Sequence, residues 1–276
     1  MLVGYLLAIA SAAAGGVYFC LGAFLVKPAV GVSVIAFTRT VYVWATLFGF
    51  LGALLSGHRR ALRLTGPQIA ANALLGVLFA VSVILAFDSV VVIQATTSAV
   101  LQRTNVLFVL LLGFLLLGDR LTRSELAAAF LVVCGVALML KGQSDLLGRG
   151  PMEALGSALA SALYQLTAKK TLAQVPAPVV NAYRNVSVLV IFVAYELIGG
   201  RSSAPPEGRI YWTIVVAAFV GPFLHTLLNL MALARLEVSK AALVAQMQPI
   251  FVLLYSSLIV WLLPSQAAAW KFSGPR

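Results

Sequence analysis

Three arginines lie deep inside apolar stretches of the sequence, where a charged side chain needs either a chemical task or a structural partner. Arg39, Arg103 and Arg184 each stand roughly six to ten residues from the nearest polar segment, and a central arginine costs ~2.5–3.5 kcal/mol to insert into a bilayer. One reading is that they line a cavity and attract an anionic or carboxylate-bearing solute. The other is that they bond to carbonyls freed at helix ends or snorkel to lipid phosphates.

Uncharged polar side chains in the same apolar stretches extend the set of candidate binding residues. Tyr18, Tyr164 and Gln165 combine aromatic and amide groups, which suit a zwitterionic or aromatic metabolite, although hydrogen bonding within a core accounts for the tyrosines equally well. His225 is the mid-span histidine, either a proton carrier or a packing residue. Since no acidic residue is deeply placed, the sequence favours a facilitated carrier or exchanger over a proton antiporter.

The composition is that of a polytopic membrane protein. The chain has 276 residues, of which 62% are hydrophobic and 10% charged, with a mean hydropathy of +1.02. Most basic residues behind the net charge of +11 stand in short segments between apolar runs, which argues against nucleic-acid binding. Cys20 and Cys134 lie inside apolar runs, so we expect no disulfide, no metal site and no cofactor.

The apolar runs predict nine membrane-spanning helices, because a bilayer core of ~30 Å needs ~20 apolar residues. The first run is too long for a signal peptide and is predicted to be a span. Thr122 to Glu125 has the pattern of a capping box at the start of the fifth helix. The predicted spans are 2–26, 30–55, 67–87, 94–117, 124–140, 152–168, 178–198, 210–233 and 241–263.

An internal repeat relates the two halves of the chain. Ser11-Ala12 and Tyr18 match Ser157-Ala158 and Tyr164 at a separation of 146 residues. Val34–Arg39 matches Val179–Arg184, and Gly76 matches Gly221, both at a separation of 145. Five helices separate the copies, and since five is odd, the halves must face opposite ways across the membrane. We predict a repeat over 1–141, a linker over 142–151 and a second repeat over 152–276.

The repeat divides the intramembrane charges into two kinds. Arg39 and Arg184 are equivalent, which favours a shared structural role, whereas Arg103 has no basic counterpart, since the matching region holds Gln246 and Gln248. Gly221-Pro222 and Pro249 are expected to kink or break their helices beside the transport path. The predicted cavity residues are Tyr18, Arg103, Tyr164, Gln165, His225 and Gln246.

The basic residues predict the orientation of the chain. With a cytoplasmic N-terminus, the loops paired by the repeat carry nine basic residues inside against three outside. Thirteen arginines against six lysines, with abundant alanine, indicate a GC-rich bacterial source. The bacterial cytoplasmic membrane is therefore the expected location.

Two stretches resemble the EamA-type branch of the drug/metabolite transporter superfamily. Leu101–Met139 has its pattern of a helix, a turn of glycine, acid, base and leucine (Gly118 to Leu121), and a glycine-containing helix. Ala232–Phe251 resembles the family's short loop followed by a helix with Pro249 near its middle. The resemblance implies two inverted five-helix repeats, a central cavity, and export or exchange of a small metabolite such as an amino acid, by alternating access and without ATP hydrolysis.

The chain departs from this pattern at its end. Thirteen residues follow Leu263, which as a helix reach only ~20 Å, so the tenth helix is predicted to be missing. A lipid or lipid-linked-sugar flippase and a truncated, non-transporting homologue therefore stay as alternatives, as do a monomer and a homodimer. The sequence has no aspartate dyad and no hydrolase or nucleotide-binding motif, so an enzyme is not expected.

Overall fold

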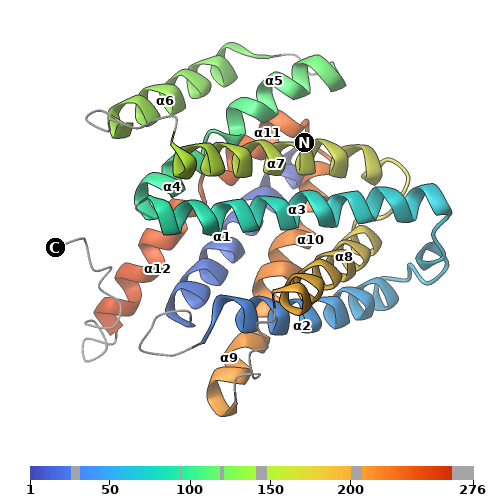
Figure 1. Cartoon of the computed structure of the whole chain (residues 1–276). Helices are drawn as coiled ribbons and strands as arrows, with labels where there is room; N and C mark the ends of the chain where they lie inside the picture. Colours follow the sequence, from blue (N-terminus) through green and yellow to red (C-terminus); the bar gives the residue numbers. More distant parts are fainter. Residues whose placement is uncertain (26–31, 94, 119–120, 141–147, 200–206, 263–276) are drawn as a thin grey trace.

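The protein is a helical bundle in the computed structural model, which describes residues 1–25, 32–93, 95–118, 121–140, 148–199 and 207–262 (Figure 1). No strand occurs in these ranges. The helical elements are α1 (Leu2–Leu25), α2 (Val34–Leu55), η1 (Arg60–Leu62), α3 (Gly66–Val92), α4 (Ala95–Gln102), α5 (Asn105–Leu117), α6 (Arg123–Leu140), α7 (Arg149–Leu172), α8 (Ala177–Ile198), α9 (Gly208–Ala218), η2 (Phe219–His225), α10 (Thr226–Leu233), α11 (Val238–Ala245) and α12 (Gln248–Leu262).

The predicted all-helical membrane architecture is confirmed. Seven helical stretches of the described chain are long and apolar enough to cross a bilayer. They coincide with seven of the nine predicted spans, and α6 and α7 occupy the other two, 124–140 and 152–168. The expected absence of a tenth helix concerns residues beyond Leu262, which lie outside the described part of the chain.

Two of the predicted spans are not continuous helices. The span predicted over 94–117 is broken at Arg103 and Thr104, and the one over 241–263 is broken at Gln246 and Met247. The hydroxyl of Thr104 donates to the carbonyl of Leu101 at 2.6 Å, which offers the backbone an alternative to the helical ladder. Pro249 stands second in α12 rather than near the middle of a helix, because a ring without an N–H suits a helix start.

A third span, over 210–233, is interrupted without being broken. Between α9 and α10 the chain forms the seven-residue π-helical segment η2, which contains Pro222. Proline removes one backbone donor and displaces the carbonyl a turn earlier, and a wider π turn accommodates both effects. The predicted disturbance at Gly221-Pro222 is therefore present as a local widening of the helix.

Helix packing follows the inverted repeat. Helix α7 packs against α3, α4 and α5, while α1, its counterpart, packs against η2, α10, α11 and α12. Helix α8 packs against α3, and α2 packs against α9 and η2. The two counterparts α2 and α8 lie against each other and run antiparallel, since Gly49 contacts Ala182 while Arg39 contacts Glu196 (Figure 1). Exchanging the halves therefore reproduces the contacts.

Two reciprocal hydrogen-bonded junctions mark the same symmetry. The hydroxyl of Ser157 donates to the carbonyl of Ser82 at 2.8 Å, and the hydroxyl of Ser82 donates to the carbonyl of Ser157 at 3.0 Å. In the other half, Ser11 donates to the carbonyl of His225 at 3.0 Å, and Nδ1 of His225 donates to the carbonyl of Ser11 at 2.7 Å. Ser11 and Ser157 are therefore equivalent, as predicted, and His225 takes the place of Ser82.

The predicted match of Gly76 with Gly221 does not hold in the packing. A Cβ on Gly76 would meet Ser187 on α8, whereas one on Gly221 would meet Tyr18 on α1. These are not equivalent helices. The reason is local: the equivalent residues Ser82 and His225 are 143 residues apart rather than 145, so the position that corresponds to Gly76 is Phe219, at the start of η2.

The contact between α2 and α8 is close enough to require glycine, which gives a test of the packing. A Cβ on Gly49 would lie 2.9 Å from Cα of Ala182, a backbone atom that cannot move aside. We expect Gly49→Ala to lower the unfolding free energy by about 1–3 kcal/mol, measured by thermal unfolding in detergent. The matched control is Gly135→Ala on α6, where a Cβ meets nothing within 4 Å and helix propensity improves by up to ~1 kcal/mol. Equal effects of the two substitutions would contradict this packing.

Candidate functional site

Arg184 lies at the centre of the bundle, surrounded by aromatic rings. Its side chain on α8 is 1% exposed, and its guanidinium carbon stands 4.6 Å from the ring centre of Phe79, 5.9 Å from that of Tyr164 and 6.0 Å from that of Tyr42. These distances allow cation–π attraction, which is strongest where water is excluded. Within the described residues, no carboxylate lies within ion-pair distance of Arg184. Among the described residues, the groups around the charge are these three aromatic side chains and the amide of Asn185.

Four central helices hold these groups in place. Tyr42 comes from α2, Phe79 from α3, Tyr164 from α7 and Arg184 from α8. The rings support one another, since Tyr164 meets Phe79 edge-on at 5.7 Å between ring centres and Tyr42 meets Phe79 edge-on at 6.3 Å. Both repeats thus contribute aromatic rings around the guanidinium. We call Arg184, together with Tyr42, Phe79 and Tyr164, the Arg184 site.

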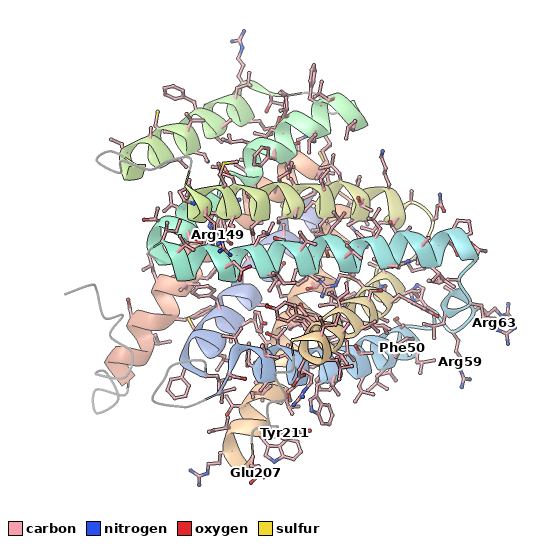
Figure 2. All side chains as sticks on the ribbon, in the orientation of Figure 1. Phe50, Arg59, Arg63, Arg149, Glu207 and Tyr211 are labelled. Atoms are coloured by element: carbon pink, nitrogen blue, oxygen red, sulfur yellow. The ribbon has the colours of Figure 1, made fainter. Side chains whose placement is uncertain are left out.

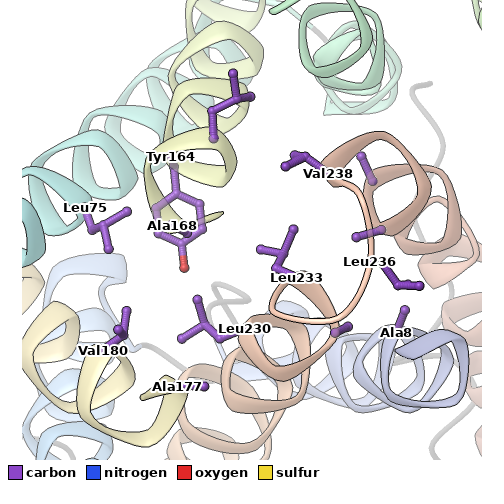
Figure 3. Packing of buried hydrophobic residues seen from close by; sticks show 14 of the residues in the cluster. Ala8, Leu75, Tyr164, Ala168, Ala177, Val180, Leu230, Leu233, Leu236 and Val238 are labelled. Carbon is purple, nitrogen blue, oxygen red and sulfur yellow. The ribbon is translucent and has the colours of Figure 1, made fainter. Parts of the chain in front are cut away.

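Two polar atoms at the Arg184 site are buried without a partner in the described structure: Nε of Arg184 and the hydroxyl of Tyr164. Figure 3 shows the hydroxyl of Tyr164 pointing among Leu75, Val180 and Leu230. A buried polar group left unpaired costs about 1–3 kcal/mol, and more when it is charged. Both atoms can donate a hydrogen bond, so the partner that each lacks is an acceptor such as an oxygen atom.

The second intramembrane arginine has an acidic partner. Nη1 of Arg39 donates to both carboxylate oxygens of Glu196, at 2.8 and 3.0 Å, and the Glu196 side chain is 7% exposed. Arg39 and Arg184 were expected to share one structural role because they are equivalent in the repeat. Their surroundings differ: one arginine is neutralised by a carboxylate and the other is not.

Of the predicted cavity residues, Tyr164 lies beside Arg184, with 5.9 Å between its ring centre and the guanidinium carbon. Tyr18 lies against Gly221, and His225 is bonded to Ser11. Tyr18 also stacks on Phe37, with 6.3 Å between ring centres.

The other three predicted cavity residues lie elsewhere. Arg103 and Gln246 stand at the two helix breaks, where Nε2 of Gln246 donates to Oδ1 of Asn105 at 3.3 Å. Gln165 is buried on α7. Within the described ranges, the side chains of Arg103 and Gln165 make no hydrogen bond.

Sequence reasoning missed Tyr42, Phe79 and Asn185. The two aromatics resemble any apolar core residue. Asn185 accepts from Nη2 of Arg184 and donates to the carbonyl of Ala45 at 3.1 Å. The available signal was the cluster of Asn181, Arg184 and Asn185, which places three polar side chains within two helical turns of an otherwise apolar span.

Comparison with known proteins identifies what the chain is similar to. The profile of the EamA-like transporter family matches residues 2–141 and again residues 149–267. A solved crystal structure, described only as that of a protein, aligns with a TM-score of 0.72 and 19% identity over 100% of this chain and 89% of its own. At that identity the likeness concerns the fold. No curated protein sequence matches the chain.

The unpaired hydroxyl gives a test of the site. We expect Tyr164→Phe to leave the melting temperature unchanged or to raise it, because the substitution removes a buried hydroxyl that has no partner. The control is Tyr183→Phe, which removes a hydroxyl that donates to the carbonyl of Leu62 at 2.7 Å and should cost about 1 kcal/mol. A marked loss of stability in Tyr164→Phe would mean that the hydroxyl has a partner after all.

Proposed function

Because the chain belongs to the EamA-like transporter family and is therefore a multi-pass membrane transporter, we propose that it carries a small solute with a carboxylate or similar anionic group, bound at the Arg184 site. The observation that carries this proposal is the buried guanidinium without a carboxylate beside it in the described structure. A bound anion would neutralise the charge and satisfy Nε of Arg184 and the hydroxyl of Tyr164.

The surroundings of Arg184 support an amphipathic solute, such as an amino acid. The rings of Tyr42, Phe79 and Tyr164 offer apolar faces to the part of the solute that carries no charge. A planar guanidinium pairs with a carboxylate through two parallel hydrogen bonds, which fixes the orientation of the solute.

The interface between α2 and α8 supports transport by alternating access. It passes through the centre of the bundle and is built from equivalent helices of the two repeats. Its two ends differ, since the ion pair of Arg39 with Glu196 joins one end and the close contact of Gly49 with Ala182 joins the other. Rocking of one repeat against the other about such an interface exposes a central site to each side in turn. We propose exchange or export by this motion, without ATP.

The distribution of charged residues at the ends of the helices supports a cytoplasmic N-terminus in a bacterial inner membrane. Figure 2 shows Arg59 and Arg63 together beyond the end of α2, while Tyr211 and Glu207 lie near α9, away from them. The loop with Arg59, Arg60 and Arg63 is the most basic of the predicted inner loops.

Counterflow in liposomes tests the proposed function. The purified chain is reconstituted and loaded with pools of amino acids, organic acids, amines or nucleosides, and uptake of labelled solute is followed. We expect saturable exchange of a carboxylate-bearing solute and a ~10–100-fold loss of apparent affinity in Arg184→Met, because hydrogen bonds to charged groups contribute ~1.5–3 kcal/mol.

Two variants and one further substrate sharpen this experiment. Arg184→Lys keeps the charge but loses the paired geometry, so its affinity should fall between those of the wild type and Arg184→Met. Arg103→Leu, at the α4–α5 break, should exchange nearly as well as the wild type. A larger loss of exchange in Arg103→Leu than in Arg184→Met would instead place the binding site at the helix break. Transfer of a labelled lipid between leaflets, with no exchange in any pool, would indicate that the protein is a lipid flippase and not a carrier of small solutes.

A further inference from the structure

His225 is fixed through one ring nitrogen and leaves the other available. Nδ1 lies 2.7 Å from the carbonyl oxygen of Ser11, so it must carry a proton and donate it. The hydroxyl of Ser11 donates back to the carbonyl of His225 at 3.0 Å. Within the described residues, Nε2 makes no hydrogen bond. The neutral ring therefore holds its lone pair on Nε2, where it can take up a second proton.

The junction between the helices does not need an imidazole. In the other half of the molecule, Ser82 and Ser157 make the same reciprocal pair of bonds with hydroxyl groups alone. His225 reaches its place through the π-helical segment that contains Pro222, a kind of helix irregularity frequent at functional sites. In the second half, which carries Arg184 on α8, the titratable group His225 thus occupies the position that Ser82 occupies in the first half.

Arg184 and His225 lie on elements that are bonded to each other, since Asn181, three residues before Arg184 on α8, donates to the carbonyl of Phe223, two residues before His225, at 3.0 Å. The titratable groups near the centre are Tyr18 on α1, Tyr42 on α2, Tyr164 on α7 and Arg184 on α8, and Tyr255 on α12 lies against Gly16 of α1. None of these groups is a carboxylate. The charged groups farther along the packed helices are bound elsewhere. Arg39 is paired with Glu196, and Lys169 donates to the carbonyls of Leu233 and Leu236 at 2.7 Å each.

The charge of Arg184 links the imidazole to the solute. While Arg184 is not neutralised, a second positive charge on His225 is repelled. An anion bound at Arg184 removes that repulsion, and protonation of His225 becomes more favourable. By thermodynamic reciprocity, the proton on His225 then strengthens anion binding by the same factor.

We propose that His225 carries a proton together with the anionic solute, so that net transport moves the two as a pair. A proton from water on one side binds Nε2 of His225 as the solute binds, and it is released to water on the other side with the solute. No other bond forms or breaks. This inference rests on the proposed anion binding at Arg184. It is compatible with exchange, because a solute returning with its own proton leaves no net proton movement.

Proton flux measured beside solute flux tests the inference. Liposomes contain an entrapped pH-sensitive dye, and the solute is one found by counterflow whose own acid group stays ionised above pH 5. For the wild type we expect net uptake to acidify the interior by about one proton per solute, and the apparent affinity to strengthen as the pH falls from 8 to 5. In His225→Ser, which restores the serine pair of the other half, we expect no proton movement and an affinity that does not change with pH.

Controls separate the possible outcomes. Ser82→Ala alters the equivalent junction without touching a titratable group and should keep the proton-to-solute ratio of the wild type. His225→Gln serves as a second variant if His225→Ser does not fold. Counterflow without proton movement in the wild type, or proton movement that persists in both His225 variants, would overturn the inference and leave the carrier intact. Absence of counterflow in the wild type would instead remove the proposed function.

Discussion

The interior of a bilayer offers no water to a polar group, so each one must be satisfied by protein or by a bound solute. This constraint divides the buried polar groups of the chain into those that have a partner and those that have none in the described structure. Arg39 has Glu196, and Lys169 has two backbone carbonyls. Arg184 and Tyr164 keep unpaired atoms in the described structure. In the proposed function, a bound solute satisfies these two.

The backbone packing of the two halves is symmetric, whereas their buried polar side chains differ. The helix contacts and the two reciprocal junctions repeat between the halves, which gives two bodies of similar structure. The buried guanidinium and the imidazole occur on α8 and η2, both in the second half. In the proposed function, the symmetric backbone lets the carrier face both sides of the membrane in similar ways, while Arg184 binds the solute.

The sequence predicted the class of protein and part of the site. Apolar runs and matched serines were sufficient for the helical membrane fold and the repeat, because both follow from regular spacing. The helix break at Arg103 was not predicted, since counting apolar residues does not detect a local change in backbone hydrogen bonding. The break expected at Pro249 does occur, just before that residue, at Gln246 and Met247. The roles of Arg39 and Arg184 were not separable either. A repeat fixes where backbone positions correspond, but the carboxylate that distinguishes the two arginines comes from Glu196, 157 residues after Arg39.

That separation has a consequence for biosynthesis. At roughly 5–20 residues per second, the ribosome reaches Glu196 about 8–30 s after Arg39. During this interval α2 is already made while its acidic partner does not exist. Arg39 lies only one to two turns from the start of α2, near the membrane face, where a long basic side chain can reach the headgroups while it waits. The ion pair that joins α2 to α8 can therefore form only after α8 has been made, and the contacts of α1 with η2, α10, α11 and α12 form later still.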